Sequence, residues 1–323
     1  MSEPRNTDTQ SLEHEPAAVD VVIVTYRSAE YIGDCLRSLD RALADIPGAR
    51  ILVVDNDSDD DIAEAVAGVS NRVTLIRRTL NDGFAAGCHA GVAESDAHRI
   101  LFVNPDAVVD AGAVHALLAA ADAHPTAGII GGRSLAPDGS TDPQSWSGRP
   151  TLWSALCFAT GLSSVFPGSA VFDPESVDRW DGRSREVPVV SGGMMLVERC
   201  VWDALGGFDR VYFLYGEDVD FCLRAGAAGW SPRVTSQATY RHEVGLSSAG
   251  SNRLPMVLRG QVTTYRRNLP TPWGALAGRL VVVGVGMRAW AARFRPAGGR
   301  RAHPPQAWRQ SWNRRSEWRQ GWS

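Results

Sequence analysis

The chain has 323 residues, of which 44% are hydrophobic, and its formal net charge is −3. This length and composition predict a globular protein with room for one large domain or two modest ones. The slightly acidic balance argues against nucleic acid as a partner. The five cysteines have neither metal-site nor disulfide spacing, so we expect buried thiols in a reducing cytoplasm.

Residues 1–18 are predicted to be a disordered N-terminus. They are mostly polar and lack the apolar segment of a signal peptide. A cytoplasmic protein is therefore expected.

Residues 19–135 alternate short apolar runs with helical patterns. The runs at 19–24, 51–54, 73–76, 100–103 and 128–130 are rich in β-branched residues, as buried parallel strands are. Helices are expected between them. This rhythm predicts parallel βαβ units with right-handed crossovers, and hence an α/β fold with a mostly parallel sheet flanked by helices.

Two of these strands end in carboxylates. The run at 51–54 is followed by Asp55, and the run at 100–103 is followed by Asn104 and Asp106. In open α/β sheets, ligands bind beyond the carboxyl ends of the strands, so we expect Asp55 and Asp106 in one crevice. Polar strand ends are common in ordinary loops, and the pair is more informative than either residue alone.

Small residues recur at the start of one predicted helix, from Asn81 to Gly91. Gly83 would allow a tight entry into the helix, and the small residues that follow would allow close packing on the sheet. The segment lacks the lysine of a Walker A loop and does not match the dinucleotide-binding glycine pattern. Close helix packing accounts for most of this pattern.

Three carboxylates, Glu217, Asp218 and Asp220, stand together at a predicted helix start after the aromatic run Tyr212–Tyr215. Asp220 and Arg224 are spaced as an i,i+4 ion pair, which leaves Asp218 without a local partner. Desolvation among aromatic side chains would raise its pKa and suit it to general-base catalysis. An acidic helix cap is the alternative interpretation.

Residues 137–188 are rich in glycine, proline, serine and tryptophan and are expected to be irregular. Residues 189–242 return to strand and helix patterns, and His242 follows a strand-like stretch at their end. A single histidine is usually structural. Near acidic loops it is a candidate metal ligand.

Residues 254–323 are predicted to be helical, basic and rich in tryptophan. Residues 288–323 hold nine arginines and one glutamate, a net charge of +8, which leaves −11 for residues 1–287. The apolar run Leu280–Met287 is too short to span a bilayer, and the last four tryptophans would share one arc of a helix. These features predict a peripheral contact with an anionic membrane, and deletion of residues 296–323 should leave a folded protein. A helical cap followed by a disordered basic end is the alternative.

Together these segments resemble family 2 inverting glycosyltransferases of the GT-A fold, from Val19 to about Ser248. Within that family the chain looks closest to bacterial rhamnosyltransferases, with galactofuranosyltransferases next. The matching segments are Val21–Arg27, Val53–Ser58, Asn81–Gly87, Phe102–Asp106, Ser191–Val197, Gly206–Asp209, Gly216–Arg224, and His242 with Gly245 and Ser247.

The resemblance implies a GT-A-type, Rossmann-like sheet with a nucleotide-sugar-binding half at 19–135 and an acceptor-binding, catalytic half at 136–253. It implies Asp218 as the catalytic base and a divalent Mg or Mn cofactor held by Asp106 and His242. The implied nucleotide-binding residues are Thr25, Asp55, Asn81, Gly83 and Asn104. The implied acceptor-side residues are Gly192, Gly193, Glu217, Asp220 and Arg224.

The chain departs from the family pattern at two positions. Asn104 stands where a strict DxD motif has its first aspartate, so Asp106 is the strong carboxylate ligand that remains. His89 stands where asparagine is often found, which leaves its role open.

The implied reaction transfers L-rhamnose from dTDP-rhamnose, with inversion, to a hydroxyl of a glycan or polyprenyl-diphosphate-linked acceptor in cell-envelope polysaccharide synthesis. UDP-galactofuranose is the alternative donor. A nucleotidyltransferase would need a glycine-rich phosphate loop after the first strand, which Thr25–Glu30 does not supply. A non-catalytic nucleotide-sugar-binding protein would be favoured by the loss of Asp106 or Asp218, and both are present.

Overall fold

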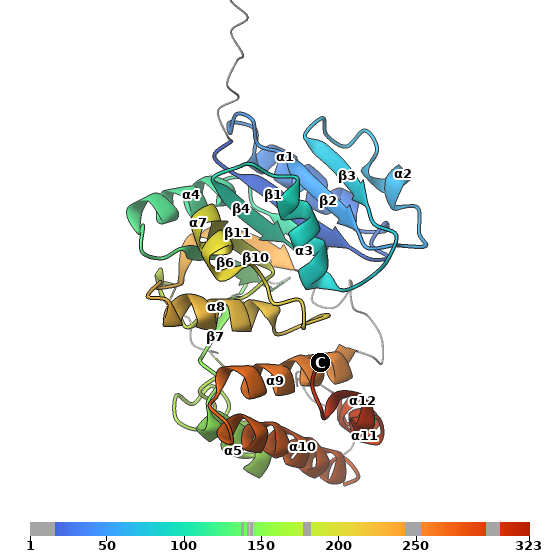
Figure 1. Cartoon of the computed structure of the whole chain (residues 1–323), viewed down its shortest axis with the longest axis vertical. Coiled ribbons are helices and arrows are strands. Elements are labelled where there is room, and N and C mark those ends of the chain that lie inside the picture. Colours follow the sequence, from blue (N-terminus) through green and yellow to red (C-terminus); the bar gives the residue numbers. More distant parts are fainter. Residues whose placement is uncertain are drawn as a thin grey trace, which may run out of the picture.

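The computed structural model describes residues 17–136, 139–140, 142, 145–176, 182–242, 253–294 and 304–323. A sheet with helices on both faces forms the upper part of the molecule in Figure 1, and a helical module forms the lower part. The strands are β1 (Asp20–Thr25), β2 (Ile51–Asp55), β3 (Val73–Arg77), β4 (Arg99–Val103), β5 (Ala107–Val109), β6 (Ile129–Leu135), β7 (Trp146–Ser147), β8 (Arg185–Glu186), β9 (Val189–Val190), β10 (Met194–Glu198) and β11 (Arg233–His242). The helices are α1 (Ile32–Ala42), α2 (Ile62–Val66), α3 (Phe84–Ala93), α4 (Ala113–Ala123), α5 (Leu152–Thr160), α6 (Leu162–Val165), α7 (Arg199–Leu205), α8 (Glu217–Ala227), α9 (Arg253–Asn268), α10 (Trp273–Ala291), α11 (Pro305–Asn313) and α12 (Arg315–Trp318).

The main sheet has the strand order β3-β2-β1-β4-β10-β6-β11-β5. Strands β3, β2, β1 and β4 are all parallel, as predicted for residues 19–135. Strand β10 then pairs antiparallel with both β4 and β6. The predicted α/β sheet flanked by helices is confirmed, and both predicted halves of the chain contribute strands to it.

Two apolar cores lie on the two faces of this sheet. Helices α1 and α4 cover one face with leucines such as Leu36, Leu39 and Leu117. Helices α3, α7 and α8 cover the other face around Trp202 and Phe208. Each fully buried side chain of this size contributes about 1.5–3 kcal/mol to the free energy of folding. The two cores therefore stabilise the sheet from both faces and fix the positions of its strand ends.

The small residues of α3 allow it to lie unusually close to β1. A Cβ on Gly87 would lie 2.6 Å from Val24 Cγ1, and one on Gly91 would lie 2.5 Å from Val22 Cγ1. A side chain at either position would force the β1 valines or the helix to shift. The close packing predicted for this helix is confirmed.

A third core holds the helical module together. It includes Leu258, Val262 and Tyr265 of α9, Val281 of α10 and Trp318 of α12. Helix α5 joins this core, although it lies in sequence within residues 136–253. The module is therefore built from two separate parts of the chain.

Helix α10 is longer than the sequence suggested. The run Leu280–Met287 lies inside a helix of 19 residues that includes both flanking arginines, Arg279 and Arg288. Among the described residues, α10 is the helix that is long and apolar enough to cross a membrane, judged by length and composition alone. The helix predicted for this part of the chain is confirmed, and it continues through both arginines.

The tryptophans of the C-terminal tail face the protein. Trp318 is wholly buried, and Trp308 and Trp312 pack against the third core. Trp322 lies under the Arg259 guanidinium, 4.1 Å from guanidinium carbon to ring centroid. The expectation that these four residues form one exposed arc is wrong, because α11 and α12 are separate helices that bury the apolar sides of α9 and α10.

Candidate active site

The carboxyl ends of β1 and β2 carry two of the predicted nucleotide-binding residues. Thr25 and Asp55 are register partners in this parallel pair, and both are wholly buried. Asp55 Oδ1 accepts a hydrogen bond from the Ser58 N–H (3.1 Å), and Arg77 Nε lies 3.7 Å from Oδ2. Within the described residues, Thr25 Oγ1 and Asp55 Oδ2 are buried without a hydrogen-bond partner. Because buried polar atoms normally have partners, these two atoms are suited to bind a ligand.

The start of α3 is joined to the loop before α8. Gly83 has a φ of 100°, and a Cβ there would lie 2.4 Å from the Phe213 carbonyl oxygen, so a side chain is excluded. The Phe84 N–H donates to that oxygen (2.7 Å). Asn81 Oδ1 accepts from the Gly83 N–H (3.2 Å), and Asn56 Nδ2 donates to the Gly83 carbonyl oxygen (3.0 Å). These bonds tie the predicted nucleotide side to the segment that carries the acidic cluster.

The turn between β4 and β5 carries the predicted metal motif. Asp106 is buried there, and the Asn104 N–H donates to the Gly193 carbonyl oxygen (3.2 Å). In the pairing of β5 with β11, His242 is the register partner of Ala107, so its backbone lies beside the turn. The structure thus brings the backbone of the second predicted metal ligand next to the first.

The His242 side chain, and Gly245 and Ser247 after it, lie outside the described residues. In the described part of the chain, no group of three or more His, Cys, Asp and Glu side chains could hold a metal ion. A divalent ion can nevertheless bind through one or two carboxylates and substrate phosphates. The buried Asp106 carboxylate fits that mode, in which a nucleoside diphosphate supplies the remaining oxygen ligands.

Asp218 lies at the start of α8, beside the loop between β9 and β10. Its Oδ2 accepts a hydrogen bond from the Gly192 N–H (3.0 Å), and its Oδ1 accepts one from the Val219 N–H (2.8 Å). Gly193, the next residue, binds Asn104 of the metal motif. Burial raises the pKa of the Asp218 carboxyl, and the two N–H groups oppose this rise. The acidic cluster and the metal motif are therefore neighbours, although they lie far apart in the sequence.

Gly192 and Gly193, two predicted acceptor-side residues, lie beside Asp218 and Tyr240. A Cβ on Gly192 would lie 3.4 Å from Asp218 Oδ2, and a Cβ on Gly193 would lie 2.7 Å from the Tyr240 hydroxyl. A side chain at Gly193 would force the Tyr240 hydroxyl or the loop to shift. Contact of these glycines with an acceptor stays a prediction.

Glu217 is more deeply buried than its neighbour Asp218. Burial, followed by the negative charge of Asp218, raises the pKa of Glu217 to about 8. Its Oε2 is buried without a hydrogen-bond partner among the described residues. Burial therefore favours the neutral, protonated form of this carboxyl. Its predicted acceptor-side role stays a prediction.

Asp220 and Arg224 form the predicted i,i+4 ion pair, with Nε 2.7 Å from Oδ2. Asn268 of α9 also donates to Asp220 (3.0 Å). Arg224 donates to the carbonyl oxygens of Leu205 (2.9 Å) and Gly207 (2.8 Å). Both side chains thus connect α8 to neighbouring segments. Their contact with an acceptor stays a prediction.

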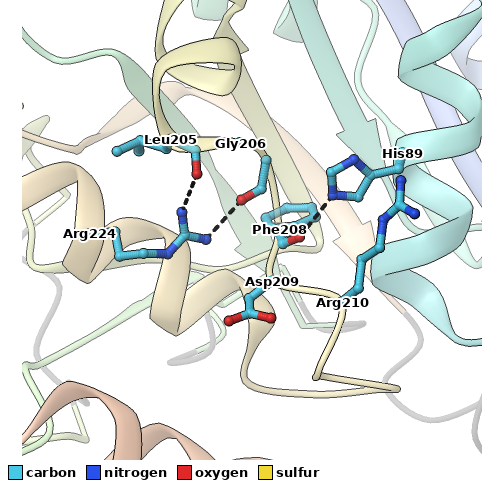
Figure 2. A pocket seen from close by; sticks show the side chains of 8 residues that line it. His89, Leu205, Gly206, Phe208, Asp209, Arg210 and Arg224 are labelled. Atoms are coloured by element: carbon cyan, nitrogen blue, oxygen red, sulfur yellow. Dashed lines mark hydrogen bonds between the residues drawn. The ribbon is translucent and has the colours of Figure 1, made fainter.

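A hollow of about 340 Å³ lies between α3, the end of α7 and α8 (Figure 2). Of the predicted site residues, Arg224 alone lines it, so this hollow is distinct from the carboxylate-lined sheet edge. His89 reaches across it and donates from Nε2 to the Phe208 carbonyl oxygen (2.8 Å), and its ring lies 5.1 Å from that of Trp202. Burial lowers the pKa of His89. The histidine therefore joins α3 to the loop before α8.

Two residues near the site have roles that the sequence does not make evident. The Asn56 backbone N–H donates a hydrogen bond to the Thr25 carbonyl oxygen, and its side-chain Nδ2 donates one to the Gly83 carbonyl oxygen. Its position directly after Asp55 is the signal that could have indicated it. Asn268 connects the helical module to Asp220, and no local pattern marks it.

Replacing Glu217 by glutamine should change how stability depends on pH. The folded-state pKa of about 8 lies above the value near 4.3 expected in the unfolded chain. The wild type should therefore lose stability relative to Glu217→Gln as the pH rises from 5 to 8, by about 1 kcal/mol or more. Urea unfolding at both pH values measures this difference. Glu94→Gln, at an exposed glutamate, should follow the wild type, and parallel curves for all three proteins would contradict the prediction.

The sequence model described as "Glycosyl transferase family 2" matches residues 20–198. An N-acetylglucosaminyl-diphospho-decaprenol L-rhamnosyltransferase of Mycobacterium tuberculosis is 32% identical over 235 residues, which cover 69% of this chain and 75% of that protein.

Solved structures share the fold at low sequence identity. A mannosyltransferase from Pyrobaculum calidifontis, in complex with GDP-Man and Mn²⁺, has a TM-score of 0.55 and 18% identity, over 88% of this chain and 77% of that one. S. aureus TarS (residues 1–349) in complex with UDP has a TM-score of 0.51 and 16% identity, over 85% of this chain and 73% of that one.

Proposed function

The chain belongs to glycosyl transferase family 2, and on this premise we propose that it transfers L-rhamnose from dTDP-rhamnose to a polyprenyl-diphosphate-linked glycan, with inversion at the anomeric carbon. The observation that carries the proposal is the hydrogen-bonded path from Asp218 through Gly192 and Gly193 to Asn104. This path supports Asp218 as the base and the neighbouring metal motif as the diphosphate site. The mycobacterial relative is a rhamnosyltransferase with a diphospho-decaprenol-linked acceptor, which favours rhamnose over galactofuranose.

In this proposal Asp218 accepts the proton of an acceptor hydroxyl as that oxygen attacks the anomeric carbon. The N–H groups of Gly192 and Val219 hold the carboxylate in place. Its raised pKa makes it a better proton acceptor than an exposed aspartate. The sugar–phosphate bond breaks on the opposite face, and the nucleoside diphosphate leaves.

Thr25 Oγ1 and Asp55 Oδ2 would bind the base or ribose of the donor, since both lack a hydrogen-bond partner within the described residues. Asn81 and Gly83 would shape the adjoining wall. Asp106, with His242, would hold a divalent ion, either Mg²⁺ or Mn²⁺. Such an ion would stabilise the negative charge that develops on the leaving diphosphate. The mannosyltransferase neighbour was solved with Mn²⁺, which supports a metal of this class.

The other two classes of function are less well supported. The family to which the chain belongs is described as a glycosyl transferase family, which supports neither a nucleotidyltransferase nor a non-catalytic binding protein. The reaction itself would take place in the cytoplasm, at the inner face of the membrane that holds the acceptor.

Incubation with dTDP-rhamnose and with UDP-galactofuranose, each with a polyprenyl-diphosphate-linked N-acetylglucosamine acceptor, tests the proposal. Release of dTDP and formation of a rhamnosylated lipid with inverted configuration, read by NMR, are expected. Retention of configuration would contradict the mechanism. Transfer of galactofuranose alone would replace the proposed donor.

Asp106→Ala should weaken metal-dependent binding of dTDP by about tenfold or more, because a hard oxygen ligand is lost. Calorimetric titration of dTDP with and without Mn²⁺ measures this effect. Asp34→Ala, which removes an exposed carboxylate on α1, is the matched control and should bind like the wild type. Undiminished transfer by the wild type in excess EDTA would rule out the metal.

A further inference from the structure

One side of α10 exposes large apolar residues to solvent. They recur every three or four positions, with a single gap filled by Arg279, and continue just past the end of the helix. Residues at this spacing share one helix face, so they form a continuous stripe, here called the α10 stripe. It consists of Trp273, Leu276, Val283, Met287, Trp290 and Phe294, whose exposed fractions run from 38% to 71%.

The opposite side of α10 packs against the other helices of the helical module. Val281 and Val285 are wholly buried in the third core, and a Cβ on Gly284 would lie 2.5 Å from the Phe158 ring of α5. Arg288 also points inward, donating to the Phe158 carbonyl oxygen (2.6 Å) with its guanidinium over the Phe158 ring. A bilayer could therefore reach the stripe side of α10 but not its whole circumference. This arrangement suits a helix that lies in a membrane surface rather than one that crosses it.

The neighbouring helices enlarge the apolar surface of the module. Trp153 and Leu156 are exposed on α5, which packs along α10. Val165 and Phe166, at the end of α6, are exposed as well. Large contiguous apolar patches are uncommon on monomeric soluble proteins, and a patch such as the α10 stripe marks an interaction site.

The charge around the stripe indicates what covers it. The described residues from 253 onward include eleven arginines and one acidic residue, Glu317, which pairs with Arg314. Arg279 and Arg293 are exposed on or beside the stripe. A second copy of this chain would bring two strongly cationic modules together and would be repelled. An anionic lipid surface would be attracted, by about 1 kcal/mol for each basic residue near it.

The position of α10 in the molecule agrees with such a contact. In Figure 1, α9 lies between the sheet and α10, so α10 stands at the end of the molecule remote from the strands. A flat surface could meet the stripe without touching the catalytic sheet.

We propose that the α10 stripe docks the protein on an anionic lipid bilayer, with α10 in the plane of the interface and the nearby arginines at the headgroups. The membrane contact thus lies on α10 and not on the C-terminal tail, because the tail tryptophans pack against the helices of the module. The biological purpose of this contact rests on the proposed lipid-linked acceptor, but lipid binding itself does not.

The test is co-sedimentation of the full-length protein with vesicles of phosphatidylcholine alone or with added phosphatidylglycerol, at low and high salt. The triple variant Val283→Ser, Met287→Ser, Trp290→Ser removes apolar groups that are exposed, so the fold should be kept. Its affinity for anionic vesicles should fall at least about tenfold.

Charge reversal with Arg279→Glu and Arg293→Glu should weaken binding to anionic vesicles and reduce its salt dependence. The matched control, Arg37→Glu and Arg41→Glu on α1, changes the same charge at the other end of the molecule and should bind like the wild type.

Equal vesicle binding by the wild type and the triple variant would overturn the proposal. So would a wild-type dimer in sedimentation velocity that the triple variant converts to monomer while vesicle binding is absent. Donor hydrolysis without vesicles should be the same in all these variants. A wild type that uses no nucleotide-sugar but still binds vesicles through the stripe would contradict the proposed function alone.

Discussion

Replacing Asp218 by asparagine is expected to lower sugar transfer by about two or more orders of magnitude, the usual scale for the loss of a general base. The amide keeps the size and shape of the side chain at the start of α8 but cannot accept the acceptor proton. Thr25 and Asp55, on β1 and β2, are unaffected, so dTDP should bind with unchanged affinity. Initial rates of transfer and calorimetric titration of dTDP measure the two effects separately.

The neighbouring carboxyl supplies the control for this experiment. Glu217→Gln replaces a carboxyl whose neutral form is favoured by burial, so transfer should change much less. Near-wild-type transfer by Asp218→Asn together with an inactive Glu217→Gln would move the base to Glu217. Because burial raises the pKa of Asp218, wild-type transfer should rise with pH at a higher pH than an ordinary aspartate would give.

The parts of the fold that depend on local pattern could be predicted from the sequence. The strands β1 to β4 can be recognised in the sequence as runs of β-branched residues. Because these strands are parallel, their carboxyl ends bring Asp55 and Asp106 to one edge of the sheet. The Asp220–Arg224 pair follows from helical spacing alone. In each case the residues that decide the structure lie within a few positions of one another or obey a general rule for parallel sheets.

Long-range pairing could not be predicted in the same way. Because β10 lies between β4 and β6 in the sheet, Gly193 comes within hydrogen-bond distance of Asn104. No local pattern in either segment predicts this hydrogen bond. The contact of Asn268 with Asp220 likewise depends on how α9 docks on α8. Periodicity shows that a helix has an apolar face but does not say which surface covers it, which is why the tail tryptophans were expected at a membrane.

Trp318→Ala is expected to destabilise the helical module by about 3–5 kcal/mol, the usual cost of removing a large buried aromatic side chain. Trp318 is wholly buried in the third core, where α12 packs against α9, and its Nε1 donates to the Ser311 carbonyl oxygen (2.8 Å). Trp290→Ala is the matched control, because Trp290 is 62% exposed and its loss should change stability by less than about 0.5 kcal/mol. Urea unfolding of both variants gives the comparison, and equal losses would show that Trp318 is not part of the core.

The same reasoning reverses the expectation for the truncated chain. Deleting residues 296–323 removes Trp318 together with Trp308 and Trp312, which leaves the apolar sides of α9 and α10 uncovered. We expect the truncated protein to unfold at lower urea than the wild type or to aggregate, rather than to fold independently. Since Asn268 of α9 holds Asp220 at the start of α8, transfer should also fall in the truncated protein, although the deletion spares every predicted catalytic residue. An unfolding midpoint and a rate of transfer to a soluble acceptor analogue both equal to those of the wild type would show that the tail is dispensable to the module.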